Sequence, residues 1–168
     1  MTNPMDISAV IARPSGASWT GRYVRSYGAP TDLGPILHRL ARDAHTATGQ
    51  HGIDTLTRTL IETHYGWNRL DPDREGERLG DCRCHEPQPP SPSWPDDEPM
   101  LPGRSAKARY AYILTPAGLR VAVRINGDWK SLGRAAYTRE TAHVRFDLMV
   151  QRARELNEAH LWDTDPLN

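Results

Sequence analysis

The segment from residue 33 to residue 44 has apolar residues at the spacing of one face of an α-helix. These residues are Leu33, Ile36, Leu37, Leu40, Ala41 and Ala44. They form one stripe along a helix of 3.6 residues per turn. Pro35 suits the first turn, where its missing N–H would have no intrahelical partner. The pattern therefore predicts an amphipathic helix that ends near Thr48.

Two later segments also have helical spacing. Residues 52–64 carry Ile53, Leu56, Leu60 and Ile61 on one face. Their short connection to the preceding helix predicts an antiparallel pair. Residues 138–158 carry a stripe of Ala142, Phe146, Met149, Val150, Ala153 and Leu156. Alternation at positions 144, 146 and 148 would also suit a strand, but the length of the segment favours a helix.

Alternating apolar and polar positions predict β-strands elsewhere in the chain. The predicted strands are 19–26, 110–114, 119–125 and 129–134. Short turns at 115–118 and at Asn126-Gly127 join the last three, and Asn-Gly is a strong signal for a two-residue hairpin. The sequence therefore predicts a C-terminal β-meander. Arg120 and Arg124 are expected on the face of the meander opposite its apolar side chains.

The remaining stretches lack periodicity. Residues 1–17 are mostly polar with Pro and Gly, which predicts a flexible arm. Residues 71–108 include seven prolines between Pro87 and Pro102, a composition typical of an extended loop insert. Residues 18–168 are then expected to form a single α+β domain around that insert. Its predicted core is a three- or four-stranded antiparallel sheet packed on two or three helices.

The charge of the chain is zero overall but unevenly distributed. Its 21 basic and 21 acidic residues cancel, yet residues 71–98 hold nine acids and three bases, and residues 99–154 hold eleven bases and three acids. The basic block would permit nucleic-acid binding, but the zero net charge disfavours it. No run approaches 18 apolar residues and no signal peptide is evident. Two cysteines do not make a disulfide framework, so we expect a cytoplasmic protein without a membrane partner.

The strongest motif for a metal is Cys82-Arg83-Cys84-His85. Thiolate and imidazole are zinc ligands, although structural zinc sites usually space their cysteines by two to four residues and this spacing is tighter. A fourth ligand would come from elsewhere, and His64 is the nearest candidate, ahead of His38 and His45. Zinc is therefore the candidate cofactor. Free thiols in a loop, a strained disulfide and a redox site remain alternatives.

No sequence motif indicates catalysis. The chain has no HExxH, GxSxG, P-loop or GxGxxG pattern, and we predict no catalytic residue. A second candidate site is the outward face of the meander, where arginine and aromatic side chains could bind an anion. The predicted ligand-binding residues are Arg120, Arg124, Lys130, Arg134 and Tyr112. The alternative is the ordinary solvated face of an antiparallel sheet.

Four motifs occur in an order that resembles a family of uncharacterised small proteins of actinobacteria, their mobile elements and actinophages. They are GRYVRSYGAPTDLG at 21–34, THYGW at 63–67, CRCH at 82–85 and YAYIL at 110–114. In the family the first three read GxYxHxDGYPTxxG, HPxGW and CYCHG. This chain departs from them with Arg25 for His, Tyr27 for Asp, Ala29 for Tyr and Glu86 for Gly. The resemblance implies a mobile-element context and no mechanism.

These patterns together lead to one functional hypothesis with two alternatives. We expect a non-enzymatic binding protein of mobile-element or phage type. It would bind a host protein or sequester an anionic small molecule such as a defence nucleotide. The alternatives are a nucleic-acid-binding accessory protein and a small zinc-dependent hydrolase that uses the CxCH cluster. The oligomeric state is left open by the sequence.

Overall fold

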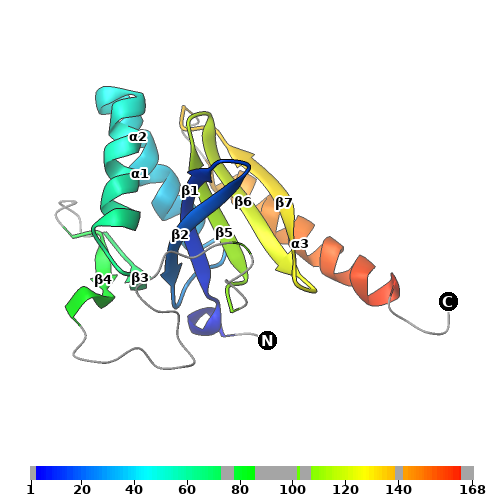
Figure 1. Cartoon of the computed structure of the whole chain (residues 1–168). Coiled ribbons are helices and arrows are strands. Elements are labelled where there is room, and N and C mark those ends of the chain that lie inside the picture. The colour runs from blue at the N-terminus through cyan, green and yellow to red at the C-terminus, as the bar shows by residue number, and fades with distance from the viewer. Residues whose placement is uncertain (1–2, 73–77, 86–101, 103–106, 139–141, 164–168) are drawn as a thin grey trace.

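A mixed β-sheet with helices against one face makes up the described part of the chain (Figure 1). The computed structural model describes residues 3–72, 78–85, 102, 107–138 and 142–163. The strands are β1 (Ala9–Ser15), β2 (Ser18–Val24), β3 (Trp67–Leu70), β4 (Gly80–Cys82), β5 (Tyr110–Thr115), β6 (Gly118–Ile125) and β7 (Asp128–Ala135). The helices are α1 (Leu33–Thr48), α2 (Gln50–Thr57) and α3 (His143–Asp163), with 3₁₀ segments η1 (Pro4–Asp6) and η3 (Arg83–His85) and the π-helical segment η2 (Arg58–Glu62).

The predicted α+β class is confirmed, but the sheet is larger than predicted. Seven strands lie in the order β4-β3-β2-β1-β5-β6-β7, and β1 pairs with β5, and β2 with β3, in parallel. The prediction of three or four antiparallel strands is therefore wrong. The meander of β5, β6 and β7 is antiparallel as predicted. Asn126 and Gly127 have φ angles of 48° and 88°, as a type I′ hairpin turn requires.

Strand β1 lies in the middle of the sheet, although residues 1–17 were predicted to be a flexible arm. Its residues Ala9 to Ala12 are fully buried between antiparallel β2 and parallel β5. Because both faces of β1 are covered, the strand is apolar on both sides and shows no alternation in the sequence. The flexible-arm prediction is wrong for these residues.

Part of the predicted insert at 71–108 is ordered secondary structure. Gly80–Cys82 forms β4, which pairs antiparallel with β3 at one edge of the sheet. The segment η3 follows it directly. The most proline-rich stretch, 86–101 with 103–106, lies outside the described residues, so the prediction of a loop there stays a prediction.

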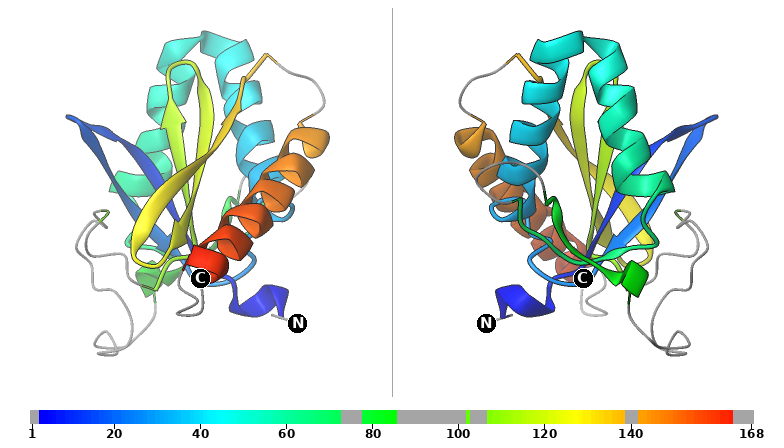
Figure 2. Two further views of the ribbon diagram at one scale, coloured as in Figure 1. Left: turned by 90° about the vertical axis from the view of Figure 1, so that its right-hand side faces the viewer. Right: turned by 90° about the vertical axis from the view of Figure 1, so that its left-hand side faces the viewer.

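The main core lies between the sheet and the three helices. Helix α1 contributes Leu33, Leu37 and Ala41, and α3 contributes Phe146 and Met149. Figures 1 and 2 show α3 running beside the β6–β7 hairpin. A β-carbon added at Gly34 of α1 would lie 2.6 Å from the Phe146 ring, so glycine at this position permits α3 to approach α1 closely.

The opposite face of the sheet carries a second, smaller core. It consists of Val10, Ala12, Trp19, Tyr23, Ala108, Ala111 and Ile113, with Ala122 and Trp129 packed against it. The ring centroids of Trp19 on β2 and Trp129 on β7 are 5.6 Å apart, edge to face. Three strands separate β2 from β7, so a flat sheet would place the two strands about 19 Å apart. The sheet therefore curls toward this face, and the two indoles close over the small side chains between them.

Candidate metal centre

Three of the four predicted metal ligands lie together. His64 Nδ1 is 3.0 Å from Cys82 Sγ and 3.4 Å from Cys84 Sγ, and the three ligand atoms all lie within 4.8 Å of one another. The side chain of the fourth, His85, lies outside the described part, so its role stays a prediction. The other two histidines considered lie elsewhere: His38 Nε2 is 2.8 Å from the Ala136 carbonyl oxygen, and the His45 ring faces Tyr137.

His64 is positioned by the end of the helix that precedes it. The last carbonyl groups of a helix have no intrahelical N–H donors. Here two side chains from the sheet donate hydrogen bonds to such carbonyl groups. Trp67 Nε1 donates to the Leu60 carbonyl oxygen at 3.1 Å, and Arg22 Nε donates to the Ile61 carbonyl oxygen at 2.8 Å. Both bonds are buried, so they fix the end of η2 on β2 and β3. The positive charge of Arg22 also suits the C-terminal end of a helix dipole.

The tight spacing of the two cysteines follows from a change of backbone conformation. In a continuous strand, residues i and i+2 share a face but lie about 7 Å apart. Here β4 ends at Cys82 and η3 begins at Arg83. The turn brings Cys84 back, so that its backbone N–H donates to Cys82 Sγ at 3.1 Å. The Arg83 N–H donates to the Gly66 carbonyl oxygen at 3.0 Å, which holds this turn next to the residues that follow His64.

The environment of Cys82 disfavours a bare thiolate. Burial raises the pKa of its thiol to about 11, and the side chains of Cys84 and Asp81 act in the same direction, whereas the hydrogen bond from the Cys84 backbone N–H acts against them. A bound divalent cation would reverse this effect, because a thiol that coordinates a metal releases its proton to the solvent and binds as the thiolate. The His64 and Trp67 rings lie 4.4 Å apart, which helps to fix the imidazole plane. Two sulfur atoms and one imidazole nitrogen form a donor set that suits zinc, which takes four ligands.

Two of the predicted anion-binding residues are neighbours across β6 and β7. Arg120 lies directly opposite Arg134, and both side chains are exposed. Arg124 lies opposite Trp129, with its guanidinium carbon 5.9 Å from the ring centroid. The Nη1 atom of Arg124 is buried, and among the described residues it has no hydrogen-bond partner. We call Arg120, Arg124 and Arg134 the basic surface.

Lys130 does not belong to this surface. The two-residue turn pairs Ile125 with Asp128, so Lys130 lies opposite Val123. Directly opposite residues share a face, and Val123 belongs to the core under the helices. The prediction that Lys130 joins the arginine row is therefore wrong. Arg134 joins the row only because of a bulge between Val121 and Ala122, where Leu132 of β7 has no partner on β6.

Tyr112 is also misplaced in the sequence-based prediction. Its side chain is fully buried in the main core, and its hydroxyl donates to the Gly28 carbonyl oxygen at 2.6 Å. Burial raises the pKa of Tyr112 well above its usual value. Tyr112 therefore fastens the turn before α1 to the sheet and does not reach a ligand on the basic surface.

Tyr112→Phe is expected to lower the free energy of unfolding by about 1–3 kcal/mol, because the buried Gly28 carbonyl loses its donor. Tyr65→Phe is the matched control, since Tyr65 is exposed. Urea denaturation of both variants measures the difference. Equal denaturation midpoints for the wild type and both variants would show that the hydroxyl of Tyr112 is not structurally important.

Sequence reasoning missed Arg22 and Trp67 as positioning residues. Arg22 is buried on β2 opposite Ile11 and faces the helices, so its guanidinium had to meet a polar group. Trp67 follows His64 by three residues in the THYGW motif. In both residues, the sequence signal was a polar side-chain atom on a face expected to be buried. The carbonyl oxygen that accepts its hydrogen bond can be identified only from the tertiary structure.

No family model, curated protein or solved structure matches the chain. Among the described residues, no helix has the length and apolar character needed to cross a membrane.

Proposed function

We propose that the protein is a non-enzymatic binding protein whose fold is fastened by a zinc ion at His64, Cys82 and Cys84. The observation that carries the proposal is the convergence of three soft or borderline ligand atoms, one from His64 and two from cysteines 18 and 20 residues later in the chain. A zinc ion held there, with His85 as the predicted fourth ligand, would be structural, because it would join the end of η2 to the edge strand β4.

The edge of the sheet formed by β3 and β4 has little other stabilisation. Strands β3 and β4 have only four and three residues, and the pairing of β3 with β2 has a single registered pair, Val24 with Trp67. Only Trp67 and Leu70 of these seven residues are buried apolar side chains. A bound metal would replace the missing packing, because the free energy of metal binding contributes to folding.

The ligand that the basic surface favours is an anion. Like charges directly opposite each other destabilise a sheet, and among the described residues no ion pair involves Arg120 or Arg134. A phosphate or carboxylate over Arg120 and Arg134 would remove this repulsion, since arginine binds such groups through parallel hydrogen bonds. A nucleotide is the proposed ligand, and an acidic region of a host protein is the alternative within the same proposal.

Titration of nucleotides and short DNA tests the anion site. The Arg120→Ala, Arg124→Ala variant is expected to bind a nucleotide at least about tenfold more weakly, because hydrogen bonds to charged groups contribute about 1.5–3 kcal/mol each. Binding should weaken with salt. The control is Arg39→Ala, Arg152→Ala, which removes two exposed helical arginines. Stronger binding of DNA than of nucleotides, with a steep salt dependence, would favour the nucleic-acid alternative. Identical curves for the wild type and both variants would reject the site.

The hydrolase alternative uses the same cluster in another way. A catalytic zinc keeps three protein ligands and a water molecule in the fourth position. Incubation of the zinc-loaded protein with chromogenic esters and phosphodiesters distinguishes the two uses. Turnover that disappears in the Cys82→Ser variant would replace the structural role with a catalytic one.

A further inference from the structure

A pocket of about 430 Å³ lies on the helix side of the sheet, between the end of β1 and α2. Buried Ile53, Thr57 and Leu114 contribute to its lining. This volume is within the range of pockets for small molecules, which combine an apolar lining with a few polar groups. The pocket lies on the opposite face of the sheet from the basic surface, and none of the three metal ligands lines it.

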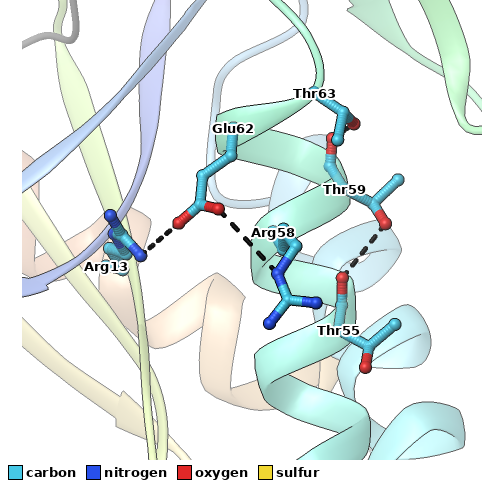
Figure 3. Close-up of polar contacts among 6 residues, drawn as sticks. All are labelled: Arg13, Thr55, Arg58, Thr59, Glu62 and Thr63. Carbon is cyan, nitrogen blue, oxygen red and sulfur yellow. Dashed lines mark hydrogen bonds and ion pairs between the residues drawn. The ribbon is translucent and has the colours of Figure 1, made fainter.

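Two arginines on the wall of this pocket share one carboxylate. Glu62 Oε1 forms an ion pair with Arg13 Nη1, and Glu62 Oε2 lies 3.9 Å from Arg58 Nε. Figure 3 shows the two guanidinium groups on either side of this carboxylate, one from β1 and one from η2. A guanidinium has five N–H donors, so each arginine keeps further donors for a ligand. Glu62 thus holds two anion-binding groups next to each other.

Arg58 and Glu62 lie at the two ends of a π-helical turn. The Thr63 N–H donates to the Arg58 carbonyl oxygen at 3.2 Å, and the Thr59 and Thr63 hydroxyls donate to the carbonyl oxygens four residues earlier (Figure 3). Hydroxyl groups that bond backward in this way bend helices. Single π-helical turns are rare and occur frequently at functional sites. The distortion here lies where the helix meets Arg13.

The same pocket also carries an acid that the arginines do not neutralise. Asp54 lies one helical turn before Arg58, and its Oδ1 accepts a hydrogen bond from Gln50 Nε2 at 2.8 Å. No ion pair involves Asp54 in the described part of the chain. The two arginines, Glu62 and Asp54 together have no net charge. A simple anion would therefore meet Asp54 unfavourably, whereas a ligand with both charges would match both groups.

We propose that this pocket binds an apolar α-amino acid as a zwitterion. Its carboxylate would bind Arg13 and Arg58, and its ammonium group would bind Asp54. One helical turn, about 5.4 Å along the axis, separates Asp54 from Arg58, which suits the short distance between the two charges of an amino acid. The apolar side chain would lie against Pro14 and Pro116, the exposed apolar residues of the lining. The proposal does not depend on zinc or on the basic surface.

Calorimetric titration with L-leucine, N-acetyl-L-leucine and L-leucinamide tests the need for both charges. We expect binding of leucine at concentrations up to about 10 mM and at least tenfold weaker binding of each blocked analogue. Arg58→Ala and Asp54→Asn are expected to weaken leucine binding by about tenfold or more. Asp54→Asn keeps the acceptor for Gln50, so its fold should persist.

The matched controls are Arg152→Ala and Asp147→Asn, which remove exposed charges from α3 and should leave leucine binding unchanged. Binding of N-acetyl-L-leucine as strong as that of leucine would show a plain anion site and overturn the zwitterion proposal. No binding of leucine, valine or phenylalanine by the wild-type protein would also overturn it. Loss of nucleotide binding in the basic-surface variant, with leucine binding retained, would confirm that the two sites are independent.

Discussion

Replacing Cys82 and Cys84 with serine is expected to abolish the binding of one zinc ion per chain and to lower thermal stability. The two thiolates are the strongest ligands in the cluster, and His64 alone holds zinc poorly. A ligand present at 100 to 1,000 times its dissociation constant stabilises the folded state by about 3–4 kcal/mol. We expect the variant to lose this amount of folding free energy. It should still fold, because the main core under the helices does not depend on the metal.

Elemental analysis, native mass spectrometry and thermal unfolding measure this effect. His64→Ala should behave like the cysteine variant, whereas His51→Ala, which changes an exposed histidine of α2, should keep both zinc and stability. Added chelator should lower the wild-type midpoint to that of the cysteine variant. Metal below about a tenth per chain, in wild-type protein purified without chelator, would show that the cysteines are plain thiols.

Leu37→Ala is expected to lower the free energy of unfolding by about 2–5 kcal/mol, the range for truncation of a buried leucine. Leu37 is 0% exposed on the face of α1 that packs against the sheet and α3. Leu40 belongs to the same stripe but is only partly buried at the margin of the core. Leu40→Ala should therefore have a smaller effect, below about 2 kcal/mol, because less apolar area and a smaller cavity are involved.

Chemical denaturation of both variants, with equal slopes, gives the comparison. The sequence stripe by itself predicts similar effects for the two leucines, so the difference between them tests the packing of α1. A larger loss for Leu40→Ala than for Leu37→Ala would mean that α1 is rotated about its axis relative to the sheet. Unchanged midpoints in both variants would show that this stripe is not the core face.

The sequence by itself determined the elements whose signals are local. The stripe from Leu33 to Ala44 lies on α1, and the Asn126-Gly127 turn produced the predicted hairpin, because helical period and turn chemistry act between residues close in the chain. The CxCH motif and His64 were also identified from residue type. Their chemistry as ligands does not depend on the fold.

Tertiary structure alone decided which distant segments meet. Strand β1 is central because it pairs with β5, about 100 residues later, and no local period reports such a partner. The face of Arg134 depends on a single bulge, which shifts every following side chain of β7 to the other face. The candidate metal ligands meet because η2 ends on Arg22 and Trp67 and because β4 turns into η3 after Cys82. All of these contacts join segments that are far apart in the chain. Their energies depend on burial and strand register, which cannot be read from the residues near each contact in the sequence.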